Sequence, residues 1–421
     1  MTRLPAFAAV LVVASVASIA LAAILAACRF TDGLSSGAPQ DGDDGGPNAC
    51  DGGPCEPLCP WYFADCDEAG SNGCEVDTRI ASNHCGACGH DCLGGACLGG
   101  ACQPILLAEG GMAPMHIVLD DASVYGVNAT GTVTRISKNG GPLVTLVPGD
   151  GHSQSPPPRI ALAGNALYYT DFGPPADGGT AGSVWATTTD GGKERIARAN
   201  APYAISVAGG YVYWSEGNPD ASAPVGAIRR VNITSKDAGS GPALMVAPEP
   251  GGIQSIIATD KTLYWSNRGT PPLYDDGALK GCESIDADAG VPCSQEAPMA
   301  APGALGLISD GNLYFTATDG LYAWACSLTS CSKRSVAPQQ FDPRFLVFDS
   351  TRTSVFWTTG DGAIKTVTKA GYPNNNETIL FQRRGTNPFD IAVDAKAVYW
   401  TDLAGVPGRP GTAPALYKLA R

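Results

Sequence analysis

The densest group of reactive side chains is a set of ten cysteines within residues 50–102. Cys85, Cys88, His90 and Cys92 stand at a spacing that resembles a zinc knuckle, since thiolates and imidazoles are ligands that zinc prefers. The same cysteines could instead form disulfides, which a short segment with few apolar residues needs for stability. The choice between these two chemistries depends on the compartment in which the protein works.

The full cysteine inventory favours disulfides. Besides the ten, the chain of 421 residues has Cys28 and four cysteines further on: Cys282, Cys293, Cys326 and Cys331. Fourteen cysteines can pair if Cys28 has another role, which suits an exported protein. The connectivity among the ten does not follow from the sequence. We expect no cofactor. Calcium could bind at the carboxylates of Asp65, Asp67, Glu75 and Asp77, but no EF-hand spacing is present, and a solvated surface is our prediction there.

Cys28 follows an apolar leader. Residues 1–27 hold one charge, Arg3, and read as an export signal. The ending Leu25-Ala26-Ala27-Cys28 resembles the lipobox of bacterial lipoproteins, which implies cleavage before Cys28 and lipidation of its thiol. Arg29 in place of aspartate implies the outer membrane or cell surface within that family. An uncleaved transmembrane anchor and a plain signal peptide are the alternatives.

Charge and composition separate a spacer from the domains that follow it. Residues 28–49 are rich in Gly, Ser, Asp and Pro, and we expect a flexible acidic linker after the lipid anchor. Residues 29–102 contain 12 acidic and 2 basic side chains, whereas residues 103–421 contain 28 and 24. No basic stripe is present, so the sequence predicts no nucleic-acid partner.

Few side chains in the rest of the chain could perform catalysis. No Gly-x-Ser-x-Gly, HExxH or Walker A motif is present. His116 reads as a hydrogen-bonded residue that lines a channel rather than as a general base. Four aspartates recur at one place of a repeat, where they could bind a metal ion or cap a turn, and capping is our prediction: Asp120, Asp260, Asp349 and Asp394.

The repeat that positions these residues is a short aromatic phrase, clearest at 398–402, Val-Tyr-Trp-Thr-Asp. Its second positions are residues 125, 168, 213, 264, 314, 356 and 399, which are 43, 45, 51, 50, 42 and 43 residues apart. A period of this length with one aromatic strand per unit is typical of a β-propeller. The 53 glycines and 33 prolines suit short strands joined by tight turns.

The phrase resembles the YWTD repeat of low-density-lipoprotein-receptor propellers, over residues 105–421. Tyr399, Trp400, Thr401 and Asp402 match it outright. The resemblance implies structural roles: the rings wedge between blades, and the acid binds backbone near a strand end. The stretch 72–92 similarly resembles a cysteine-rich module common in secreted and surface proteins of myxobacteria.

We expect an all-β, seven-bladed propeller. The seventh repeat lacks its fourth strand, and residues 105–109 precede the first, so pairing of the two ends would close the ring. Six blades, as in the YWTD family, is the alternative, with the worn first repeat outside the ring. The sequence thus divides into a signal (1–27), anchor and linker (28–49), disulfide module (50–102) and propeller (103–421).

The strand map places the remaining cysteines and the candidate binding loops. Cys282 with Cys293, and Cys326 with Cys331, would each staple one hairpin. The longest loops all fall between second and third strands, so they share one face of the ring: 172–181, 218–225 and 268–276. The candidate ligand contacts in them are Asp220, Arg268, Tyr274, Asp275 and Asp276, although these loops could equally be neutral insertions.

Two functions remain open. The first is a cell-envelope-anchored lipoprotein that acts as a binding or scaffold protein, with a protein or glycan held by the propeller loops and the membrane reached through the lipid. The second is a cation-dependent propeller enzyme of lactonase, lyase or phosphoesterase type. Because no catalytic constellation accompanies the repeat, we favour the binding protein.

Overall fold

The computed structural model describes residues 59–67, 73–154, 156–173, 175–176, 179–217, 226–233, 244–249, 252–259, 261–270, 273–283, 299–326, 331–369, 377–406, 408 and 410–421. The leader, Cys28 and the linker lie outside these residues. Within them, no helix is long and apolar enough to cross a membrane.

Seven antiparallel sheets form a β-propeller, and in six of them the four main strands follow chain order. Blades one to three consist of β6 (His116–Leu119), β7 (Ser123–Val127), β8 (Val133–Ser137) and β9 (Val144–Val147); β10 (Ile160–Ala163), β11 (Ala166–Asp171), β13 (Gly179–Thr188) and β14 (Gly191–Asn200), with β12 (Pro175–Ala176) beside β13; and β15 (Ile205–Ala208), β16 (Tyr211–Glu216), β17 (Gly226–Asn232) and β18 (Leu244–Glu249).

Blades four to six repeat the arrangement, and blade seven has only three strands of its own. They consist of β19 (Ile253–Ala258), β20 (Thr262–Asn267), β21 (Ala278–Glu283) and β22 (Met299–Ala300); β23 (Leu307–Ser309), β24 (Leu313–Ala317), β25 (Gly320–Cys326) and β26 (Cys331–Pro338); β27 (Pro343–Phe348), β28 (Ser354–Thr359), β29 (Ala363–Thr368) and β30 (Thr378–Gln382); and β31 (Pro388–Val393), β32 (Ala397–Asp402) and β33 (Ala415–Ala420).

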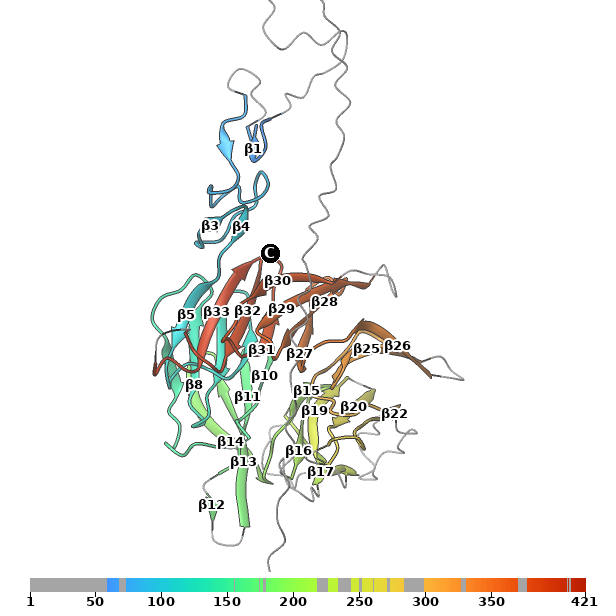
Figure 1. Ribbon diagram of the computed structural model, residues 1–421. Coiled ribbons are helices and arrows are strands. Elements are labelled where there is room, and N and C mark those ends of the chain that lie inside the picture. The colour runs from blue at the N-terminus through green and yellow to red at the C-terminus, as the bar shows by residue number, and fades with distance from the viewer. Residues whose placement is uncertain are drawn as a thin grey trace, which may run out of the picture. The chain divides into compact units, whose positions relative to one another are not determined.

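The two ends of the propeller meet in blade seven. Strand β5 (Ile105–Glu109) supplies its fourth strand, pairing with β33 so that Leu416 lies opposite Ala108. Figure 1 shows β33 between β5 and β32, which confirms the predicted closure. The first strand of every blade contacts the first strand of the next, from β6 round to β31 and back to β6. The ring therefore has seven blades, and the six-bladed alternative is wrong.

The aromatic phrase is buried on both faces of its strand, as the resemblance implied. Trp214, Trp265, Trp357 and Trp400 are fully buried. A strand whose side chains alternate between faces can bury adjacent aromatic residues only if both faces are covered. Each blade provides this cover for its neighbour: Trp400 packs in one cluster with Phe356 of the preceding blade.

The polar residue that ends the phrase binds backbone amides near the strand end, as expected. The Asp402 carboxylate accepts hydrogen bonds from the backbone N–H groups of Asn387 and Ala404, each at 2.9 Å. Asn267 at the equivalent place accepts one from Gly269. These contacts tie the start of one blade to the end of its second strand.

The first repeat departs most from the aromatic phrase, yet it forms a regular blade in which one aromatic residue is replaced by glycine. Gly126 stands where other repeats have an aromatic residue. A Cβ there would lie 2.4 Å from Cβ of Pro114 and 2.6 Å from the carbonyl oxygen of His116, so no larger residue fits. Pro114 occupies the space, and this packing explains the departure from the phrase without loss of the blade.

The amino-terminal module has little secondary structure and is held by disulfides. Its strands are β1 (Phe63–Ala64), β2 (Val76–Asp77), β3 (Cys97–Leu98) and β4 (Ala101–Cys102). Its bonds join Cys59 to Cys74, Cys66 to Cys88, Cys85 to Cys97, and Cys92 to Cys102. Cys85, Cys88 and Cys92 are therefore each bonded to a cysteine outside the knuckle-like run, and disulfides rather than zinc account for them. Cys50 and Cys55 lie outside the described residues.

Candidate functional site

The described part of the loop at 268–276 lies at the end of the ring where the inner strands begin. In each blade the first and second strands are antiparallel, so the first begins where the second ends: Ile205 lies opposite Trp214, and Ile253 opposite Asn267. A loop that follows a second strand therefore leaves from the end at which the inner strands begin. We call this the start end of the ring.

The loop at 268–276 is built by contacts among its own residues. The Arg268 guanidinium lies over the ring of Tyr274, 4.1 Å from its centroid. The Asp276 carboxylate accepts hydrogen bonds from the backbone N–H of Thr270 at 2.5 Å and from its hydroxyl at 2.7 Å. These hydrogen bonds lower the pKa of Asp276. The described part of the loop, residues 268–270 and 273–276, is thus held by its own contacts.

Backbone geometry supports the same loop. Tyr274 has a φ of 55°, in the left-handed region that non-glycine residues adopt only when surrounding contacts hold them there. The backbone N–H of Gly303 donates to the carbonyl oxygens of both Arg268 and Tyr274, at 3.0 and 3.1 Å. Leu273 and Asp275 point outward, and Leu273 is 74% exposed. The sequence did not single out Leu273.

The structure thus brings together Arg268, Tyr274 and Asp276, with Asp275 exposed beside them. Asp220 and the rest of 218–225 lie outside the described residues, as does part of 172–181. Cys282 is disulfide-bonded and fully buried. Cys293 lies outside the described residues. Cys326 and Cys331 are opposite each other in the β25–β26 hairpin, where the staple was predicted.

A polar cavity of about 170 Å³ lies at the same end, among the inner strands. Its walls come from five blades, and the polar or charged residues among them are His116, Arg159, Gln254, Ser255 and Asp390. Of these, sequence analysis named His116 alone. The others occupy places in the repeat that vary from blade to blade, so no motif marks them. A comparison of the residues that begin each first strand would have shown that several are polar.

His116 is a buried, neutral lining residue. It is 1% exposed, and its Nδ1 lies 3.2 Å from Oδ2 of Asp390. Burial is the main cause that lowers the pKa of His116 to about 4, and the Arg159 charge lowers it further, while the bond to Asp390 opposes both. A base works best when its pKa is near the working pH, so this imidazole is poorly suited to general-base catalysis at neutral pH.

Arg159 is clamped between aromatic rings. Its guanidinium carbon lies 4.7 Å from the ring centroid of Tyr203 and 4.4 Å from that of Phe345. Nη2 donates a hydrogen bond of 2.7 Å to the Tyr203 hydroxyl. These contacts restrain the guanidinium group at the wall of the cavity.

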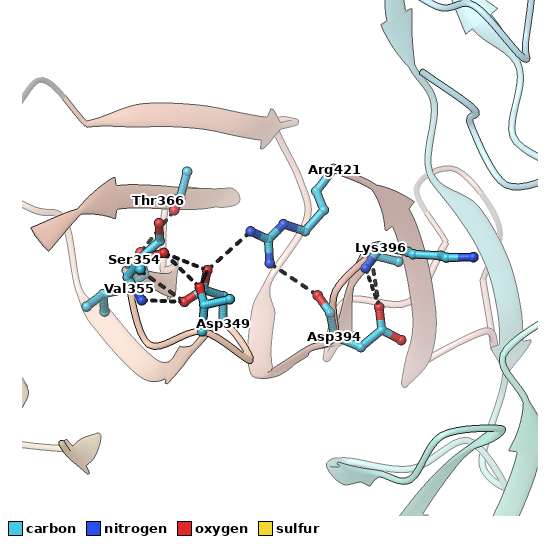
Figure 2. Close-up of polar contacts among 10 residues, drawn as sticks. Asp349, Ser354, Val355, Thr366, Asp394, Lys396 and Arg421 are labelled. Carbon is cyan, nitrogen blue, oxygen red and sulfur yellow. Dashed lines mark hydrogen bonds and ion pairs between the residues drawn. The ribbon is translucent and has the colours of Figure 1, made fainter. Parts of the chain in front are cut away.

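The aspartates that follow the first strands cap turns, as predicted. Asp349 accepts from the backbone N–H groups of Thr353 and Ser354, and Asp394 accepts from those of Lys396 and Ala397. Figure 2 shows Asp349 and Asp394 with the guanidinium of Arg421 between them. Asp120 caps its turn in the same way. Asp260 lies outside the described residues.

Three carboxylates gather in the amino-terminal module. One oxygen each of Asp65, Asp67 and Glu75 lies within 4.8 Å of the others. The fourth predicted member, Asp77, instead binds Arg79 through both carboxylate oxygens. Glu75 also accepts a hydrogen bond from the backbone N–H of Cys66. The solvated surface stays the prediction here, with calcium binding as the alternative.

No protein-family model and no curated protein matches the sequence. Among solved structures, the chain is similar to the RRP9 WD40 repeats, with a TM-score of 0.53 and 9% identity over 76% of this chain and 97% of that one. It is also similar to the computationally designed Ika8 protein, with a TM-score of 0.47 and 12% identity over 75% of this chain and 99% of that one.

The likeness to the RRP9 WD40 repeats, at 9% identity, concerns the fold alone. Together with the strand order it defines the chain as a seven-bladed β-propeller, preceded by a disulfide-rich module. Propellers commonly present loops and a channel mouth for binding and scaffolding, and the same fold serves many unrelated activities. The activity of this chain must therefore be argued from its own residues.

Proposed function

We propose that the protein is an exported, membrane-anchored binding or scaffold protein of the YWTD-like type, which holds a protein or glycan at the start end of its propeller. The observation that carries this proposal is the loop at 268–276. Its Arg268–Tyr274 stack and its Asp276–Thr270 hydrogen bonds fix its shape, and Leu273 and Asp275 face outward.

A pre-shaped loop favours binding because little conformational entropy is lost when the ligand docks. An exposed leucine beside an exposed carboxylate offers both an apolar contact and a charge. Leu273 and Asp275 lie between contacts that already fix the backbone, so they present their side chains at defined positions. Loops on a rigid scaffold are the usual place for binding residues.

Anchoring is the second part of the proposal. The leader 1–27 would be removed, Cys28 would carry the lipid, and residues 29–49 would space the folded part from the membrane surface. Arg29 favours the outer membrane or cell surface. Intact-mass analysis of the membrane-extracted protein tests the lipid: an unmodified amino terminus would refute it.

The binding test uses the full exported chain, immobilised and exposed to the envelope fraction of the producing organism, separated into protein and glycan pools. The variant is Leu273→Ala with Asp275→Asn. The control is Ile379→Ala with Asp121→Asn, which removes one exposed apolar and one exposed acidic side chain in two other blades. We expect the loop variant to retain at least about tenfold less ligand than wild type, as for a binding hot spot. Equal retention by the two variants would refute the loop as the site.

A further inference from the structure

We propose that the cavity at the start end binds the carboxylate of a small organic acid. Arg159 would be the anchoring cation, and Gln254 would supply a second set of hydrogen bonds. The inference does not rest on the loop at 268–276, because it concerns a different ligand in a different part of the start end.

The guanidinium group of Arg159 has N–H donors that its hydrogen bonds within the described residues do not use. An arginine carries five N–H bonds, and here one is used on the Tyr203 hydroxyl. Nη1 lies 3.4 Å from Nδ1 of His116. That nitrogen must carry a proton to bond the Asp390 carboxylate, so it cannot also accept from Arg159. No carboxylate within the described part of the chain forms an ion pair with Arg159.

Asp390 is occupied elsewhere. Its Oδ2 accepts from the backbone N–H of Ile117 at 2.9 Å as well as from His116. Its Oδ1 accepts from its neighbour Ile391 at 3.0 Å. These donors stabilise the charge of Asp390 locally, so the positive charge of Arg159 has no direct partner. Because Asp390 is still negative, the site suits a monoanion better than a dianion.

The Nε atom of Arg159 is the independent observation that points to a ligand. It is buried and has no hydrogen-bond partner within the described residues. A buried donor without a partner is costly, and native proteins seldom keep one without a reason. Gln254 lines the same cavity, and its amide offers both donors and an acceptor, so a carboxylate that also bears a hydroxyl would bond to it.

Size and stiffness limit the ligand further. A volume of about 170 Å³ holds about six water molecules at ~30 Å³ each, or an acid of a few carbon atoms. It cannot enclose a folded protein segment or a glycan chain. Contacts with the Tyr203 and Phe345 rings restrain the guanidinium group, and a restrained guanidinium suits two parallel hydrogen bonds to a planar carboxylate.

The experiment measures binding to the full exported chain by calorimetry at constant ionic strength. The probes are lactate, gluconate and galacturonate, with neutral galactose and inorganic phosphate as comparisons. We expect at least one of the three acids to bind at millimolar or lower concentration, and galactose not to bind. Absence of binding by all three acids, equal binding of galactose, or tighter binding of phosphate would each overturn the proposal.

Variants assign the site. Arg159→Gln should raise the Kd for the bound acid about tenfold or more, because the variant loses a charge-assisted pair of hydrogen bonds. Gln254→Leu keeps the volume and should raise it several-fold, and it provides a second test if Arg159→Gln does not fold. Arg384→Gln is the matched control: Arg384 is exposed and precedes β31 at the same end of the ring. An equal loss with Arg384→Gln, or no loss with Gln254→Leu and Arg159→Gln, would overturn the assignment.

Discussion

Replacement of Asp349 by asparagine tests whether the capped turns hold the propeller together. Asp349 follows β27 and is 5% exposed. Its oxygens accept hydrogen bonds from the N–H groups of Thr353 at 2.8 Å and Ser354 at 3.1 Å, and from the hydroxyl of Thr351 at 2.8 Å. Arg421, the last residue, also reaches it (Figure 2). One carboxylate therefore joins its own turn to the carboxyl terminus.

The pKa of Asp349 sets the size of its expected contribution to the free energy of unfolding. Burial alone would raise this pKa, but the hydrogen bonds from Ser354, Thr351 and Thr353 outweigh it and lower the pKa from 3.8 to about 2. At about 1.4 kcal/mol for each pKa unit, the ionised group contributes ~2.5 kcal/mol to the free energy of unfolding. Because the folded-state pKa is the lower one, this contribution is complete above about pH 4 and is lost as the pH falls towards about 2.

Asparagine keeps one oxygen for the two backbone donors but cannot accept from the threonine hydroxyl with its amide nitrogen. We therefore expect Asp349→Asn to lose about 2 kcal/mol at neutral pH and much less near pH 2. Urea unfolding followed by fluorescence of the buried tryptophans measures the difference at each pH. Asp121→Asn, in the exposed part of another turn, should change little. A loss that is the same at all pH values would refute the electrostatic reasoning.

Two further predictions concern the ring and its use of metal ions. Deletion of residues 414–421 removes β33, which leaves β5 without a partner and one edge of β32 unpaired. The melting temperature should therefore fall sharply, and an unchanged value would contradict closure by the two ends. Addition of millimolar calcium or magnesium should not shift the propeller's melting temperature, since the carboxylate oxygens of Asp120, Asp349 and Asp394 accept hydrogen bonds from backbone N–H groups of their turns. A clear shift would favour the cation-dependent enzyme.

The repeat made most of the fold predictable. Each copy of the aromatic phrase marks a strand buried on both faces, and its spacing gives the size of a blade. The missing fourth strand of the last repeat, with a spare strand at 105–109, indicated how the ring closes. Gly126 made the aromatic phrase of the first repeat hard to recognise in the sequence. Only the folded chain shows that Pro114 fills the place of the aromatic ring.

The candidate site was predictable in part. Loops after equivalent strands share one end of a propeller whatever their sequence, so Arg268, Tyr274 and Asp276 could be placed together. Their stacking and hydrogen bonds could not be predicted, because these contacts depend on the left-handed backbone conformation of Tyr274. Gln254 and Asp390 were missed, since neither belongs to the repeated phrase.

The sequence by itself determined the period of the repeat, the strands of each blade and the covalent stapling of the amino-terminal module, because these depend on local spacing and composition. Tertiary structure alone decided the cavity. His116, Arg159 and Asp390 are separated by up to 274 residues and become neighbours only when the last blade closes against the first. Ring closure sets those distances, and no local pattern in the chain encodes them.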